Sequence, residues 1–131
     1  MSAPRRVVTS PHAPAPGAYY SQAIASGDLL FCSGQIAIDP KTGQMVEGGI
    51  EAETKQVLEN LEAVLRAAGA GLADVVKTTV YLADFSEFPA MNAVYVRAFP
   101  DQPPARATVG VVALPRGAKI ELEAIARLSQ P

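Results

Sequence analysis

Residues 50–82 contain a helix-like pattern of apolar residues followed by a strand-like one. This pair of patterns constrains the fold more than any other feature of the sequence. Over residues 50–68 the apolar residues recur at spacings of three and four, which predicts an amphipathic helix that ends at Gly69. The next run, DVVKTTVYLAD, is β-branched and aromatic, and it predicts a strand over residues 75–82. This pair of elements indicates a layer of helix packed on a sheet.

The segment before the helix carries the signals of a hairpin and of a turn. In SQAIASGDLLFCSG, two apolar runs flank Ser26-Gly27-Asp28, so residues 22–25 are predicted to pair with residues 29–32. Ser33-Gly34-Gln35 is expected to break the second strand. Residues 39–43, DPKTG, then predict a turn, with proline at its first corner and glycine where φ is positive.

After the strand at 75–82 the chain predicts one more helix and two more strands. Asp84 and Ser86 can begin a helix with apolar residues three and four apart, and Pro100 ends it. Strands are expected at 105–112 and at 119–128. We therefore predict one α+β domain over residues 1–131, with a mixed β-sheet, both helices on one face, and a Pro/Ala-rich arm at 1–17.

Two of the predicted strands carry apolar residues at both odd and even positions, so both of their faces are apolar. A strand of this kind has no polar side to turn toward water, and the runs at 75–82 and 105–112 both have this composition. With both helices on one face of the sheet, the other face would expose a large apolar patch in a monomer. The pattern therefore predicts a homo-oligomer.

Composition excludes several classes of function. The 11 Lys and Arg against 13 Asp and Glu give a net charge of −2 without a basic stripe, so we expect no nucleic-acid partner. No apolar stretch is long enough to span a membrane, and the proline-rich start does not resemble a secretory signal, so a cytoplasmic protein is expected. One cysteine, Cys32, and one histidine, His12, provide no disulfide and no zinc set, so we expect no metal.

Arg106 stands alone in the small apolar run PPARATVGV and needs an anion, because an unpaired buried charge is costly. In KIELEAIARL, alternation places Glu121 and Glu123 on the same face. If the two strands are neighbours, Arg106 can form a structural ion pair with one glutamate. Alternatively, Arg106 holds a small acid while a partly buried glutamate with a raised pKa transfers a proton.

Several segments in order resemble one family. They are SGQI, DPKTG, QVLENLEAVLRAAG, DVVKTTVYLADFSEF, PPARATVGV and LPRGAKIELEAIA. Over about residues 17–128 the chain resembles the Rid family, the reactive intermediate deaminases also called RidA/YjgF. The resemblance implies a homotrimer of chorismate-mutase-like α+β subunits that bind small carboxylic acids in clefts between neighbours.

The resemblance also implies roles for individual residues. Arg106 matches the arginine of the PAR motif, which clamps the substrate carboxylate. Glu121, the first glutamate of the KIE-E motif, is associated with the activation of water. Tyr20 matches a cleft tyrosine in the GPYSQA-like segment, and Asn92 matches an asparagine of the second helix that is assigned to substrate binding.

Two positions depart from the family pattern. The chain reads GAYYSQ where GPYSQ is common, so Tyr19 stands in the place of proline, and either Tyr19 or Tyr20 can line the cleft. Thr108 replaces a cysteine that many RidA proteins carry two residues after the arginine. It keeps a hydroxyl for a substrate, so this change affects the choice of substrate more than its binding.

The implied activity is that of a 2-iminobutanoate/2-iminopropanoate deaminase. Such enzymes hydrolyse 2-imino acids, which equilibrate with enamines such as 2-aminoacrylate, to 2-oxo acids and ammonia without metal or cofactor. Two alternatives remain open: another Rid branch, such as an aminomuconate-type deaminase, and a non-catalytic trimeric module that binds small carboxylates. Ribonuclease activity, also linked to the family, is disfavoured by the acidic charge balance.

Overall fold

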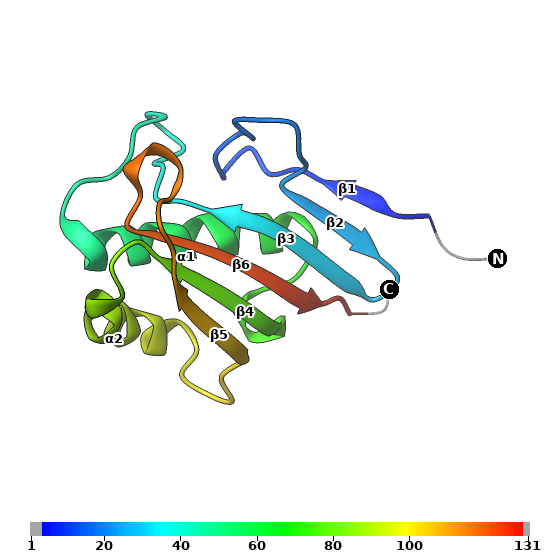
Figure 1. Ribbon diagram of the computed structural model, residues 1–131. Helices are drawn as coiled ribbons and strands as arrows, with labels where there is room; N and C mark the ends of the chain where they lie inside the picture. Colours follow the sequence, from blue (N-terminus) through cyan, green and yellow to red (C-terminus); the bar gives the residue numbers. More distant parts are fainter. Residues whose placement is uncertain (1–3, 130–131) are drawn as a thin grey trace.

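A six-stranded mixed sheet forms the centre of the molecule, with strand order β1-β2-β3-β6-β4-β5 (Figure 1). The computed structural model describes residues 4–129, so residues 1–3 of the expected arm and 130–131 of the expected domain lie outside the described residues. The strands are β1 Arg6–Val8, β2 Ala23–Ser26, β3 Leu29–Gln35, β4 Val75–Leu82, β5 Ala105–Gly110 and β6 Ile120–Arg127. The helices are α1 Gly49–Ala67 and α2 Phe88–Ala98, with 3₁₀ turns η1 Leu72–Asp74, η2 Phe85–Glu87 and η3 Pro115–Gly117. The predicted α+β class is confirmed.

Both helices lie on the same side of the sheet (Figure 1). All neighbouring strands are antiparallel except β4 and β5, which are parallel and joined through α2. Parallel neighbours need such a crossover, because a tight turn cannot return the chain to the same end of the sheet. We call the side of the sheet that carries no helix the open face.

Helix α1 forms where the apolar spacing predicted it. Its Val57, Leu61 and Val64 are fully buried, and they form one core cluster with the inward residues of β6. Gly69, with φ of 81°, follows the helix and takes the left-handed conformation that ends it. Alternation on β6 is also confirmed, with Ile120, Leu122, Ala124 and Ala126 buried.

Two predicted strand boundaries are wrong. Strand β3 continues through Ser33 and Gly34 to Gln35, because an extra residue is absorbed as a bulge instead of ending the pairing. Cys32 pairs with Ala124 and Gln35 with Leu122, so three steps on β3 oppose two on β6. Strand β5 ends at Gly110, two residues earlier than expected.

The open face is partly apolar, as the alternation indicated. Phe31, on β3, pairs with Ile125 of β6, and Val109, on β5, pairs with Tyr81 of β4. Phe31 is 44% exposed and Val109 42% exposed. Large apolar side chains left in water usually mark an interface, so the oligomer remains a prediction that this surface supports. No helix in residues 4–129 has the length and apolar character needed to cross a membrane.

Candidate functional site

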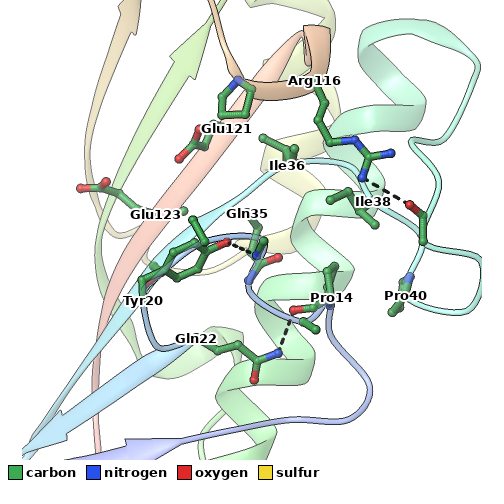
Figure 2. Close-up of a pocket in the computed structure, with 17 residues that line it drawn as sticks. Pro14, Tyr20, Gln22, Gln35, Ile36, Ile38, Pro40, Arg116, Glu121 and Glu123 are labelled. Carbon is green, nitrogen blue, oxygen red and sulfur yellow. Dashed lines mark hydrogen bonds between the residues drawn. The ribbon is translucent and has the colours of Figure 1, made fainter.

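A cavity of about 820 Å³ opens at one end of the open face (Figure 2). One wall is the arm between Pro14 and Tyr20, and another is the bulged end of β3 with the residues that follow it. Glu121 and Glu123 of β6 line it, and so does Arg116 of η3, whose guanidinium turns away from both carboxylates toward the Gly43 carbonyl. The cavity therefore combines a largely apolar wall with two carboxylates.

Glu121 is the predicted acid–base residue, and it lies in this cavity. Its carboxylate rests against Gly34 in the β3 bulge. Burial raises the pKa of the Glu121 carboxyl, and the negative charge of Glu123 raises it further. A carboxyl with a raised pKa exchanges protons closer to neutral pH, as a general acid–base group requires.

The structure separates the two tyrosines that the sequence left open. Tyr20 lines the cavity, and its hydroxyl oxygen accepts a hydrogen bond of 3.4 Å from the Gly17 amide. Tyr19 is fully exposed and does not contribute to the cavity wall. The geometry favours Tyr20 for the cleft.

Gln22 fastens the arm against the sheet, a role that the sequence did not reveal. Its buried side chain accepts a hydrogen bond from the Ser10 amide at 2.6 Å and donates to the Ser10 and Pro14 carbonyls at 3.2 and 2.9 Å. The arm thus folds over the end of the sheet and forms a cavity wall, as Figure 2 shows for Pro14. No periodic signal marks a single polar residue that directly precedes a strand, as Gln22 precedes β2.

Asn60 of α1 supports the opposite wall of the cavity. Its side-chain amide donates to the carbonyls of Ile36 and Ile38 at 3.2 and 2.9 Å, and its own oxygen accepts from Gln56. These bonds hold the chain after β3 in place, and both isoleucines line the cavity. Asn60 is buried beside Leu61, so it is a polar residue on the apolar face of the helix. A polar residue in this position indicates a buried hydrogen bond, and this was the signal in the sequence that could have revealed its role.

Arg106 lies apart from this cavity, in a cage formed by α2. Its guanidinium donates to the Asn92 side-chain oxygen at 2.7 Å and lies over the rings of Tyr95 and Phe88, at 4.6 and 5.3 Å from their centroids. Within residues 4–129 no carboxylate oxygen lies within 4.0 Å of it. The alternative of an ion pair within the subunit is therefore wrong.

Thr108 follows Arg106 on the same side of β5. Its hydroxyl oxygen is buried and, within the described part of the chain, has no hydrogen-bond partner. The neighbouring Thr78 hydroxyl differs, because it pairs with the Tyr95 hydroxyl at 2.7 Å. Thr108 therefore keeps unused hydrogen-bonding capacity close to the arginine cage.

The structure does not meet the condition under which Arg106 could approach Glu121 or Glu123 within one subunit. Strand β4 lies between β5 and β6, so the two strands are not neighbours. Arg106 pairs with Thr78, which faces the helices, whereas Glu121 pairs with Tyr81. Thr78 and Tyr81 are three residues apart in the strand, and so Arg106 and Glu121 point to opposite faces.

The predicted site residues thus form two groups in the subunit. Tyr20 and Glu121 share the cavity, while Asn92, Arg106 and Thr108 lie on α2 and the edge strand β5. Cys32 belongs to neither group. It is buried as expected, and burial raises the pKa of its thiol to about 12, so the thiol stays protonated at neutral pH.

Comparison with known proteins identifies the family. The family model described as Endoribonuclease L-PSP matches residues 10–128. A RutC family protein of Pyrococcus horikoshii is 52% identical over 93% of this chain and 97% of its own. The 2-iminobutanoate/2-iminopropanoate deaminase of Rattus norvegicus is 48% identical over 93% of this chain and 89% of its own.

Solved structures agree with these relatives. RidA from the Antarctic bacterium Psychrobacter superposes with a TM-score of 0.91 at 41% identity, covering 94% of this chain and 99% of that one. TdcF of E. coli, solved with bound serine, superposes with a TM-score of 0.90 at 34% identity, covering 95% and 99%. Sequence and fold therefore agree along nearly the whole chain, and the chain belongs to the Rid/YjgF/L-PSP family.

Proposed function

We propose that this protein hydrolyses 2-imino acids, with 2-iminopropanoate and 2-iminobutanoate as substrates, to 2-oxo acids and ammonia. The observation that carries the proposal is the Arg106 cage. A guanidinium has five N–H donors, and here one nitrogen bonds to a neutral amide while two aromatic rings cover the group. The remaining donors suit the two oxygens of a substrate carboxylate.

Glu121 supplies the proton transfer in this proposal. Water adds to C2 of the protonated imine while Glu121 accepts a proton from the water, and Glu121 then returns this proton to the nitrogen of the resulting carbinolamine. The C2–N bond breaks as the C2=O bond forms, and Glu121 takes the hydroxyl proton and passes it to the departing ammonia, so protonated imine and water give the 2-oxo acid and ammonium without a further reactant. Such acid–base assistance is worth about a hundred- to ten-thousandfold in rate.

The complete site in this proposal lies between two subunits of a homotrimer. Arg106 is on an edge strand and Glu121 is on the open face, so a neighbour that packs its β5 edge against this open face joins them. The exposed Phe31 and Val109 give such contact apolar surface to bury. The names of relatives with 46–48% identity, 2-iminobutanoate/2-iminopropanoate deaminases, support the choice of substrate.

An imine lifetime assay tests the activity. An amino-acid oxidase generates 2-iminopropanoate from alanine or 2-iminobutanoate from 2-aminobutanoate, and the protein is expected to speed loss of the imine by at least a hundredfold over the rate in water. An unchanged lifetime for both would refute the deaminase proposal. If calorimetry then showed 2-oxobutanoate binding, the non-catalytic module would be the better description, and hydrolysis only of an aminomuconate would favour the other Rid branch.

The raised pKa of Glu121 predicts the pH dependence of the reaction. As a base, Glu121 acts when ionised, so kcat should fall through one protonation as the pH drops below its raised pKa. The titratable groups that interact with it are Glu123 and the Tyr81 hydroxyl, while Arg116 of the same cavity is bonded to the Gly43 carbonyl. Glu123→Gln removes a neighbouring negative charge, so the acidic limb of kcat against pH should move to lower pH. If the acidic limb does not move in Glu123→Gln, a group other than Glu121 is responsible for it.

A further inference from the structure

Gly34 lies in the β3 bulge, at the point where the Glu121 carboxylate approaches the backbone. A methyl group built on Gly34 would lie 2.9 Å from Cδ of Glu121, 3.0 Å from its Cγ, and closer still to Oε2. Separations near 3 Å are far shorter than van der Waals contact between carbon atoms, so the two groups cannot occupy this arrangement together. The carboxylate holds its position only because residue 34 has no side chain.

The backbone at Gly34 gives no other reason for a glycine. Six glycines of residues 4–129 have positive φ values, which favour glycine over other residues, and Gly34 is not among them. An alanine can therefore adopt its conformation. The atoms in conflict also belong to the end of a flexible side chain, so the chain can relieve the contact by moving Glu121 alone.

We infer that Gly34 is a positioning residue for the Glu121 carboxylate, and this inference rests on the proposed function. The bulge brings the backbone of residue 34 beside Glu121, and the missing side chain leaves the space that the carboxylate fills. Any larger residue turns the carboxylate away from the β3 wall. Water attack at C2 requires a base at one defined point, so a displacement of about 1 Å is costly.

The test is Gly34→Ala, with Gly71→Ala as the matched control. Gly71 has an extended backbone and nothing within 4 Å of an added methyl group, and it lies far in sequence from the site residues. Gly34→Ala should lower kcat about tenfold to a hundredfold with little change in KM, while Gly71→Ala keeps the wild-type rate. In the Glu121→Gln background, Gly34→Ala should lower the residual rate no further, because both changes disable the same group.

Two measurements separate this inference from the deaminase proposal. NMR titration of the Glu121 carboxyl carbon, which needs no activity, should give a lower pKa in Gly34→Ala, as the group moves toward water. If Gly34→Ala loses thermal stability, Glu121→Ala should restore it by removing the conflict. A folded Gly34→Ala with unchanged kcat and titration would overturn the role of Gly34 even in an active enzyme, and so would a stability loss that persists with Glu121→Ala.

Discussion

Arg106→Ala should lower kcat/KM for 2-iminopropanoate by at least about thirtyfold. The arginine has no carboxylate partner among the described residues of its own subunit, so in the proposed complex the substrate is its counter-ion. Removing one member of a buried charge pair costs about 2–5 kcal/mol, which is about thirtyfold to several thousandfold in kcat/KM. Initial rates over a range of substrate concentrations, with circular dichroism to verify folding, measure the effect.

Two further variants separate charge from geometry. Arg106→Lys keeps the charge but loses the planar fork and its stacking on Tyr95, so an intermediate loss is expected. Arg97→Ala removes an exposed arginine from the last turn of α2 and should leave the rate unchanged. If Arg106→Ala kept full activity, the arginine would have only a structural role.

Asn92→Asp tests the role of the substrate as counter-ion directly. The change is nearly isosteric and places a carboxylate where Arg106 now meets a neutral amide oxygen at 2.7 Å. An internal ion pair would then satisfy the guanidinium, and the substrate would have to compete with it. We expect KM to rise at least tenfold with no loss of thermal stability, whereas an unchanged KM would mean that the substrate carboxylate binds elsewhere.

Local pattern determined the elements but not their order in the sheet. Apolar spacing located α1 and β4 because burial on one face is a property of neighbouring residues. Strand order depends on contacts that are distant in sequence. The chain returns from α2 to pair β5 in parallel with the outer edge of β4, while β6 enters between β4 and β3, and no local period encodes this insertion.

The same limit applies to the site. Arg106 and Glu121 were recognisable as a charge in an apolar strand and a carboxylate on an alternating strand, and the resemblance added their roles. Their placement on opposite faces was not predictable, because it follows from the register of β4 against both neighbours. Gln22 was missed because its partners are backbone groups, which leave no mark in the side-chain sequence. Asn60 was visible as a polar residue on an apolar helix face, but its partners, the Ile36 and Ile38 carbonyls, were not.

Glu121→Gln should abolish most of the catalytic acceleration while the fold is preserved. The amide keeps the shape of the side chain but cannot accept the proton, so kcat should fall by about a hundred- to ten-thousandfold. The pKa of Glu121 is raised in the folded state, so its ionisation lowers stability as the pH rises from the unfolded-state pKa through the raised one, and the full loss is present above it. The variant should therefore be at least as stable as the wild type at neutral pH, as thermal denaturation can verify.

Mixing the two inactive variants then tests whether the site is shared. In the cyclic trimer that we propose, each cleft would take Arg106 from one subunit and Glu121 from the next. A cleft is intact when its Arg106 comes from a Glu121→Gln subunit and its Glu121 comes from an Arg106→Ala subunit. Random assembly of equal amounts, by co-expression under two affinity tags, should restore about a quarter of the wild-type activity, because each cleft needs both correct choices.

The opposite placement of these residues makes the mixing experiment decisive. With β4 between their strands, a subunit acting alone would need large rearrangement to bring Arg106 and Glu121 to one substrate. Light scattering at micromolar concentration should give the mass of three subunits, and a mass of one would eliminate the shared cleft. Mixed oligomers can be isolated through both tags. If they were as inactive as either variant alone, a site built between subunits would be refuted, because intact clefts would then be present without turnover.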